Sequence, residues 1–171
     1  MTTLLENNTL RWYALYTKGR HEKCVNEALQ KNRIESFLPL RRIRKRWSDR
    51  SVTIEEPLFK SYLFVKTGPL ETQKVLRSKG AVGFVSSQGR PVTVQNSVID
   101  SLKAIIANEI SVDPVPYLST GDLVSVKRGV FKGIEGTIVR KDDKKCRLVL
   151  SIAAIQASIS VEIDACLVEK I

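Results

Sequence analysis

The sequence predicts an α+β fold in two parts, an antiparallel sheet flanked by helices and then a small five-stranded β-barrel. Three observations lead to this prediction. Segments with strand and helix periodicity interleave through residues 1–110, two prolines interrupt residues 111–119, and short alternating segments separated by glycines fill residues 120–171. A period of two indicates a half-buried strand, and a period near 3.6 indicates a helix. We therefore expect two domains joined by a short linker, with boundaries at these residues.

The first half of the chain is expected to contain strands and helices in the order β-α-β-β-α-β-β-α. The aromatic, alternating residues 11–18 begin it as a strand. Residues 22–32 follow as a helix with one apolar face and Asn32 as a left-handed stop. Residues 35–46 and 52–66 then return as two extended strands around a polar turn. Helices packed on one antiparallel sheet are the arrangement that buries such a pattern.

The alternation of strand and helix continues up to residue 110. A short helix is expected within residues 67–77, followed by a hairpin of residues 82–85 and 91–94 around a Gln88-Gly89 turn. Asn96 is expected to cap a helix in which apolar residues recur at i, i+4, i+7 and i+8. These elements complete the predicted sheet and its helical cover.

The C-terminal part has the pattern of a small β-barrel. Val124 and Val126 point to one side of a strand while the polar residues between them point to the other. Gly129, Gly133 and Gly136 then allow the backbone to reverse and bulge. Further strands are expected at residues 134–139, 147–152, 159–164 and 167–171. So short a domain buries enough apolar surface only by closing into a barrel.

The charge of the chain is strongly positive and unevenly distributed. Its 171 residues carry 28 Lys and Arg against 18 Asp and Glu, a net charge of +10 with a pI near 9.7. Residues 120–171 hold 9 of those bases and 7 of those acids, so most of the excess lies before them. A basic surface of this kind favours a polyanionic partner such as nucleic acid.

The sequence excludes several classes of site. Cys24, Cys146 and Cys166 are too few and too scattered for a disulfide framework or a zinc site, so no metal is expected. No catalytic signature is present, and Glu55 and Glu56 cannot act together because consecutive strand residues face opposite sides. No enzyme activity, catalytic residue or cofactor is therefore expected.

Nothing in the sequence predicts a membrane location. No apolar run approaches the roughly 20 residues that span a bilayer. The first ten residues lack the basic start and apolar run of a signal peptide. A soluble, cytoplasmic, monomeric protein without a membrane partner is expected.

Two basic segments are candidates for contact with nucleic acid. Residues 41–50 hold six basic residues and one acid around Trp47, which could stack on a base if it is exposed. Residues 17–23 place two cations beside a glycine just before a helix N-terminus, where backbone amides can receive a phosphate. The alternative for residues 41–50 is a solvated hairpin kept soluble by its charge, with Trp47 packed on the sheet.

Aromatic residues recur on the predicted strands of the first domain. Because neighbours on a strand face opposite sides, these rings cannot all point to one side of the sheet. If Trp12, Leu15 and Phe64 point inward, Tyr16 and Tyr62 lie nearer the rim, where exposed rings would form a protein-docking surface. The alternative is that all of these residues belong to the core.

The motifs along the chain resemble those of the NusG family of transcription elongation factors. In the first half the matching segments are RWYALYTKGRHEK, EEPLFKSYLFVK, KGAVGFVSSQGRPVTV and NSVIDSLKAII. In the second half they are GDLVSVKRGVFKGIEGTIV, which is similar to a KOW motif, and VEIDACLVEKI. The resemblance implies an NGN-like domain in residues 1–110 and an SH3-like KOW barrel in residues 120–171.

This resemblance implies that RNA polymerase is the main partner. The NGN domain of the family docks on the clamp of the largest catalytic subunit of bacterial RNA polymerase. The residues that match its docking pocket are Tyr16, Phe59, Tyr62 and Phe84. The basic residues expected to contact upstream or non-template DNA are Lys18, Arg20, Arg41, Arg42, Arg44, Lys45, Arg46, Lys74, Arg77 and Lys79. A factor bound in this way suppresses pausing and termination.

Departures from the family pattern favour a specialised member. Lys60-Ser61 stands where general members have Pro-Gly, as in paralogues that prevent termination in particular long operons. Residues 71–74 lack the His/Thr-rich turn by which some paralogues recognise a DNA element. The expected function is therefore antitermination in a particular operon. A general elongation factor and, in another class, a ribosome- or RNA-binding KOW protein are the alternatives.

The partner of the barrel is predicted from a missing aromatic residue. General members use an aromatic near the penultimate strand to engage ribosomal protein S10 or the termination factor Rho, whereas this chain has SIAAIQASISVEI there. That difference argues against Rho. An apolar substitute is expected from Ile152, Ile155 and Ile159. Contact with nascent RNA is expected from Lys127, Arg128 and Lys132.

Overall fold

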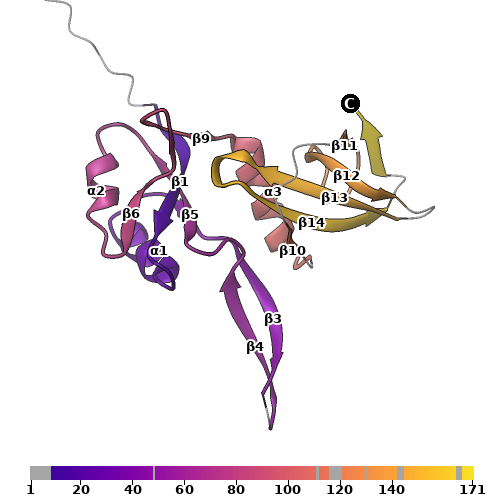
Figure 1. Cartoon of the computed structure of the whole chain (residues 1–171), viewed down its shortest axis with the longest axis horizontal. Coiled ribbons are helices and arrows are strands. Elements are labelled where there is room, and N and C mark those ends of the chain that lie inside the picture. The colour runs from indigo at the N-terminus through magenta and orange to yellow at the C-terminus, as the bar shows by residue number, and fades with distance from the viewer. Residues whose placement is uncertain are drawn as a thin grey trace, which may run out of the picture. The chain divides into compact units, whose positions relative to one another are not determined.

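The chain has the α+β structure that the sequence predicted, and it divides into two compact units. The structure is a computed structural model that describes residues 9–47, 49–110, 112–115, 121–129, 131–141, 145–164 and 167–171. One unit combines Met1–Leu38 with Lys60–Val94, and the other combines Pro39–Phe59 with Gln95–Ile171. Figure 1 labels the helices and strands of both. The predicted domain boundary stays a prediction, because linker residues 111 and 116–119 lie outside the described residues.

The first unit contains a five-stranded antiparallel sheet. Its strands are β1 (Arg11–Thr17), β2 (Ser36–Phe37), β5 (Tyr62–Thr67), β6 (Ala81–Phe84) and β9 (Thr93–Val94). The strand order is β2-β5-β1-β6, and β9 also pairs with β1. Ala14 and Leu15 on the central strand are fully buried although they face opposite sides. Both faces near the middle of β1 are therefore covered.

Two helices of this unit, α1 (Glu22–Lys31) and α2 (Thr72–Leu76), contact the sheet through β2, β5 and β6. Their buried apolar residues are Val25 and Leu29 on α1 and Val75 on α2. Residues four apart lie on one face of a helix, so α1 needs only this narrow apolar stripe to attach itself.

The predicted left-handed stop after α1 is displaced by one residue. Asn32 has a φ of −84°, and Arg33 is the residue with positive φ, 59°. The Asn32 amide Nδ2 donates to the Ala28 carbonyl at 2.9 Å. This bond satisfies a carbonyl that the end of the helix leaves open, so Asn32 closes the helix without leaving the right-handed region.

The predicted pairing of strands at residues 82–85 and 91–94 is wrong, because β6 and β9 each pair with β1, whereas the predicted Gln88-Gly89 turn is confirmed. These residues join the short strands β7 (Ser86–Ser87) and β8 (Arg90–Pro91), and their φ values are 50° and 75°. Positive φ at both central positions belongs to the type I′ turn, whose twist matches that of a hairpin. Glycine adopts this conformation without a Cβ clash, which explains its place here.

The second unit begins with a long hairpin of β3 (Leu40–Arg46) and β4 (Ser51–Pro57), followed by helix α3 (Asn96–Ala107). The predicted cap of α3 is wrong by one residue, since Gln95 is the N-cap and Asn96 is already helical. The buried face of α3 holds Ile99, Leu102 and Ile105. Val98, the first residue of the apolar repeat predicted for this helix, is half-buried, and Ile99 is buried in its place.

The barrel region is one antiparallel sheet in the order β10-β14-β13-β12-β11-β15. Its strands are β10 (Asp113–Val115), β11 (Asp122–Val126), β12 (Glu135–Lys141), β13 (Lys145–Ile152), β14 (Ala157–Asp164) and β15 (Val168–Lys170). A 3₁₀ turn, Ala153–Ile155, joins β13 to β14. The sheet has one strand more than predicted, because β10 lies within the predicted linker. Pro114 fits there since β10 is an edge strand, which has no second neighbour to receive an N–H.

Two of the three barrel glycines have the predicted role. Gly129 and Gly133 have positive φ, 82° and 84°. Gly136 differs, because a Cβ there would lie 2.7 Å from the Val149 carbonyl oxygen on the neighbouring strand. Gly136 therefore allows close packing of β12 on β13, and it is not a turn residue.

Candidate functional site

Two tyrosines form an exposed aromatic pair at one end of the first sheet. Tyr16 on β1 lies directly opposite Tyr62 on β5, and their ring centroids are 5.3 Å apart at 53°. Tyr16 is 43% exposed and Tyr62 is half-buried. On the other side of Tyr16 the sheet continues with Gly83, where a Cβ would meet no atom within 4 Å. The missing side chain leaves the flank of Tyr16 open, and we call Tyr16, Tyr62 and Gly83 the tyrosine patch.

Phe84, predicted to belong with these tyrosines, faces the other side of the sheet. It is paired across strands with Leu15, and successive residues of β1 point to opposite faces. Its ring packs edge-on against Tyr13, with centroids 5.8 Å apart at 71°. Both rings line a shallow groove of about 430 Å³ together with Pro69 and Pro91. The predicted pocket is therefore divided between two faces.

Phe59, the fourth predicted docking residue, is 5% exposed. A ring this deeply buried offers a partner almost no surface, and its loss would act first on packing. The structure thus leaves Tyr16 exposed and Tyr62 half-buried on one face of the sheet, and Phe84 half-buried on the other.

A buried carboxylate fixes the turn that precedes Tyr62. Glu22 is 5% exposed, and its Oε1 accepts the backbone N–H of Ser61 at 2.7 Å. The Ser61 carbonyl in turn accepts the N–H of Thr17 at 2.9 Å. These bonds hold Ser61 at a φ of 65°, a conformation that side chains other than glycine rarely adopt. Glu22 therefore positions the start of β5, and no local sequence signal identifies Ser61 as its partner.

A first basic group lies where the loop after β1 meets the loop before β6. The Lys18 N–H donates to the Gly80 carbonyl at 2.9 Å, and the Gly80 Cα leaves no room for a Cβ beside His21. Lys18, Arg20 and Lys79 are all exposed, and we call them the loop cations. Lys74 and Arg77 are exposed on and just after α2. The His21 Nδ1 lies 3.0 Å from the Gly19 carbonyl oxygen, and the His21 carbonyl accepts the Val25 N–H at 2.9 Å, as expected of a helix-start residue.

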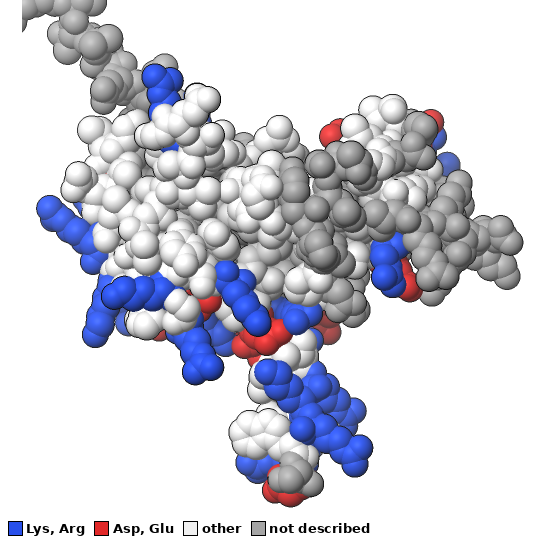
Figure 2. All heavy atoms as spheres, viewed as in Figure 1, with Lys and Arg blue, Asp and Glu red and all other residues white. Residues whose placement is uncertain are grey.

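A second basic group lies on the hairpin of β3 and β4, where Figure 2 shows Lys and Arg gathered. Arg41 forms an ion pair with Glu56 at 2.6 Å. Arg42 pairs with Glu55 at 3.3 Å and also with Glu109. The hairpin thus neutralises part of its charge internally, and Arg44, Lys45 and Arg46 are exposed nearer its tip.

The tip of the hairpin carries an exposed indole. Trp47 is 55% exposed, so it does not pack on the sheet as the alternative interpretation required. The Arg50 guanidinium lies 5.9 Å from the centre of the Trp47 ring, within the range of a cation–π contact. A hollow of about 320 Å³ at the tip is lined by Arg46, Trp47, Asp49, Arg50 and Ser51.

The predicted barrel residues separate into buried and exposed sets. Ile152, Ile155 and Ile159 are 2%, 7% and 0% exposed, so they form barrel core and present no apolar surface to a partner. Arg128 and Lys132 are exposed, and Lys127 pairs with Glu169 at 2.7 Å. Arg128 and Lys132 are therefore accessible for the predicted contact with RNA. The predicted apolar surface of isoleucines is wrong, because these side chains are buried.

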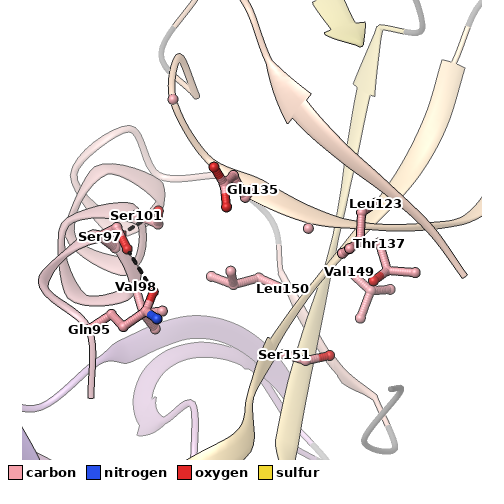
Figure 3. A pocket seen from close by; sticks show the side chains of 12 residues that line it. Gln95, Ser97, Val98, Ser101, Leu123, Glu135, Thr137, Val149, Leu150 and Ser151 are labelled. Atoms are coloured by element: carbon pink, nitrogen blue, oxygen red, sulfur yellow. Dashed lines mark hydrogen bonds between the residues drawn. The ribbon is translucent and has the colours of Figure 1, made fainter. Parts of the chain in front are cut away.

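A further pocket of about 380 Å³ lies between α3 and the barrel strands within the second unit (Figure 3). On the helix side, Ser101 donates to the Ser97 carbonyl at 2.7 Å and Ser97 contacts Gln95 at 3.4 Å. Among the described residues that line it, Glu135 is the one with an ionisable side chain. A lone carboxylate beside helix-bound serines supplies no acid–base pair, so this pocket suggests no catalytic chemistry.

Comparison with known proteins decides the family. Residues 10–103 match the sequence model of the family described as "Transcription termination factor nusG". The chain belongs to the NusG family. A relative from Rickettsia bellii, named "Transcription termination/antitermination protein NusG", is 23% identical and is aligned over 96% of this chain and 92% of its own length. A relative of the same name from Streptococcus pyogenes serotype M3 is 24% identical over 94% and 97%.

The fold of NusG is also found among solved structures. The structure titled "Domain interaction in Thermotoga maritima NusG" superposes with a TM-score of 0.58 at 23% identity, covering 95% of this chain and 97% of that one. The NusG match at residues 10–103 includes β1, β5 and the hairpin of β3 and β4, so it covers the tyrosine patch and both basic groups. Within the described residues, no helix is long and apolar enough to cross a membrane.

Proposed function

We propose that this protein is a transcription elongation factor that binds bacterial RNA polymerase and suppresses pausing and termination along a particular operon. The observation that carries the proposal is the NusG match over residues 10–103, within which the tyrosine patch is exposed. The patch is proposed to dock on the clamp of the largest subunit, and the loop cations and the hairpin to lie against DNA. The protein is proposed to act in the cytoplasm.

The size of the patch is sufficient for a selective contact. The exposed part of the two rings amounts to roughly 100 Å², which at about 25 cal/mol per Å² is worth about 2.5 kcal/mol when covered. This is an upper bound on the gain in binding free energy, because association also costs translational freedom and side-chain ordering. A bound factor changes pausing only through its differential affinity for the elongating and paused states. A patch that fits the clamp in one of those states can therefore shift the occupancy of pauses substantially.

A first experiment tests docking by co-elution with purified bacterial RNA polymerase. Tyr16→Ala and Tyr62→Ala should each weaken binding at least tenfold, because each removes ring surface from the patch. Leu70→Ala is the matched control. Leu70 is 69% exposed and follows the opposite end of β5, about 17 Å along the strand from Tyr62. Equal binding by all three variants would remove the patch from the proposal.

The choice of a specialised role depends on Lys60-Ser61. General members have Pro-Gly at this point, and here a serine holds the left-handed turn with the help of Glu22. Sequencing of transcripts after deletion of the gene separates the roles. Loss of distal transcripts confined to one long operon supports the specialist, whereas changes across most genes support a general factor. Co-sedimentation with ribosomes and no binding to polymerase would support the RNA-binding alternative.

A further inference from the structure

The hairpin of β3 and β4 has two chemically different faces. The strands pair in a regular register from Leu40↔Pro57 to Arg46↔Ser51, so alternate residues share a face. One face, here named the arginine face, holds Arg42, Arg44, Arg46, Ser51, Thr53 and Glu55. The other, here named the aliphatic face, holds Arg41, Ile43, Lys45, Trp47, Arg50, Val52, Ile54 and Glu56. Figure 2 shows Lys and Arg side chains gathered along one side of the hairpin, whereas uncharged side chains make up most of the other side.

The charges of the aliphatic face have partners within the hairpin. Glu56 lies 2.6 Å from the Arg41 guanidinium and 3.9 Å from Lys45 Nζ. Arg50 lies over the Trp47 ring. Side chains on this face are also less exposed than their neighbours, since Ile43, Val52 and Ile54 are half-buried. Three cations stand beside one carboxylate on this face, but each already has a partner, Glu56 or the Trp47 ring, that a bound anion would have to displace.

On the arginine face the cations near the base of the hairpin have acidic partners, whereas those near its tip have none among the described residues. Arg42, nearest the start of the hairpin, forms ion pairs with both Glu55 and Glu109. Within the described part of the chain, Arg44 and Arg46 form no ion pair, and the residues directly opposite them are Thr53 and Ser51. Two exposed guanidinium groups thus stand on one side of a strand, about 7 Å apart, with no carboxylate between them.

This arrangement suits a ligand with repeated negative charge. Like charges on one face of a ribbon repel each other, so the row is not explained by the stability of the hairpin. A guanidinium binds a phosphate through two parallel N–H donors, and successive phosphates present the repeated charge that two successive arginines can bind. A ligand with a single carboxylate would neutralise only one of the two arginines.

The aliphatic face determines how the hairpin can lie on nucleic acid. A two-stranded ribbon fits into the major groove of DNA, but both of its faces then lie near phosphates or base edges. Placing Ile43, Val52 and Ile54 against phosphates or base edges would cost more free energy than it returns. Cations without acidic partners on one face alone instead favour a hairpin that lies along the outside of the sugar–phosphate backbone. Such a contact does not depend on base sequence.

We infer that the hairpin binds the sugar–phosphate backbone of a nucleic acid through its arginine face alone, independently of base sequence, with Arg44 and Arg46 as the principal contacts. The inference rests on the proposed function in one respect, since it refines the nucleic-acid contact proposed there. It does not require polymerase, because the arginine face is exposed in the free protein.

The test compares two double variants of the full chain. Arg44→Ala with Arg46→Ala removes two charges from the arginine face. Lys45→Ala with Arg50→Ala removes two charges from the aliphatic face of the same hairpin, so the net charge falls equally. Binding is followed by fluorescence anisotropy at several salt concentrations. The probes are a 20-base-pair DNA duplex of arbitrary sequence and single-stranded DNA and RNA of the same sequence.

The arginine-face variant should flatten the slope of log affinity against log salt. The change should be about 1.8 on duplex DNA or about 1.4 on a single strand, because each lost phosphate contact removes about 0.9 or 0.7. At 0.1 M salt this corresponds to roughly 60-fold or 25-fold weaker binding. The aliphatic-face variant should keep the parental slope, and a second duplex sequence should bind equally well. The probe that shows the largest loss identifies the natural strand.

Two results would overturn the inference. Equal losses in both double variants would mean that total charge matters and the face does not. Parental binding by the arginine-face variant on all three probes would remove the contact altogether. Co-elution with polymerase separates these results from a failure of the proposed function, because Tyr16→Ala should keep nucleic-acid binding while the arginine-face variant keeps the tyrosine patch. Circular dichroism of each variant checks that the exposed substitutions leave the fold intact.

Discussion

The two large sheets of this protein bury different kinds of side chain. In the first unit the sheet is rich in aromatic residues, with Trp12 and Phe64 buried and Tyr16 exposed at its end. The barrel sheet buries aliphatic residues, among them Ile159 and Val161. An aromatic ring with a polar group can be apolar on one side and hydrated on the other, whereas an isoleucine cannot. The first sheet can therefore extend its core to the surface at the proposed docking site.

The surface charges follow the same division. In the barrel, Lys127 pairs with Glu169 and Arg147 with Glu162, which leaves this surface close to neutral. The loop cations and the arginine face, in contrast, concentrate positive charge outside the barrel. The buried apolar residues of the barrel thus contribute to stability, while the residues proposed to bind polymerase and DNA lie on the first unit and the hairpin.

The largest expected effect is in the barrel core. Ile159→Ala removes a fully buried side chain and leaves a cavity, so the free energy of unfolding should fall by about 2–5 kcal/mol. Urea denaturation measures this loss. Leu123→Ala, at a barrel position 59% exposed, should change stability by less than about 0.5 kcal/mol. If Ile159→Ala instead weakened polymerase binding without loss of stability, the division between the two sheets would be broken.

The next effect compares one glycine from each sheet. Gly136→Ala places a methyl group 2.7 Å from the Val149 carbonyl and 2.9 Å from the Leu148 side chain, so the barrel should lose about 1–3 kcal/mol. Gly83→Ala meets no atom within 4 Å and should leave the stability of the first unit within about 0.5 kcal/mol. Thermal unfolding of both variants makes the comparison. A stability loss at Gly83 equal to that at Gly136 would show that the flank of Tyr16 is not open.

A third effect concerns the support of the tyrosine patch. Glu22→Ala leaves the Ser61 N–H without its acceptor, which should cost about 1–3 kcal/mol in the free energy of unfolding. Glu22→Gln keeps an acceptor oxygen of similar reach and should recover part of that loss. Glu27→Ala, at an exposed position of the same helix, is the control. Equal stability of Glu22→Ala and Glu27→Ala would exclude the buried bond as the element that fixes the turn.

Sequence patterns predicted what depends on local chain geometry. The alternation at Val124 and Val126 and the Gln88-Gly89 turn were sufficient to locate strands and a hairpin, because a period of two and positive φ leave direct traces in residue choice. The two-part architecture was predicted from the prolines of residues 111–119 and the change of pattern on either side of them, and the resemblance to the NusG family supplied the type of each part. The position of Tyr16 at the rim also followed from the pattern of apolar residues around it.

The remaining features depend on contacts between distant residues. Phe84 faces away from Tyr16 because of its register with Leu15, which is fixed only when β1 and β6 pair. Glu22 finds Ser61 across 39 residues. The isoleucines expected to form a partner surface are buried by neighbouring strands, and the two-faced hairpin requires a register that composition alone does not give. Such features depend on which strands pair and in which register, and the sequence of one segment alone does not determine that.

The smallest expected effect is a gain in stability at the turn before Tyr62. Ser61 has a φ of 65°, and glycine adopts this conformation without a Cβ penalty. Ser61→Gly should therefore raise the free energy of unfolding by about 0.5 kcal/mol, the strain relieved exceeding the entropy that glycine adds to the unfolded chain. Ser51→Gly, on strand β4, should lower it by about 0.5–1 kcal/mol because a strand offers no such relief. Opposite signs in urea denaturation would confirm that the turn stores strain, and a loss at Ser61 would show that its side chain contributes more than the strain costs.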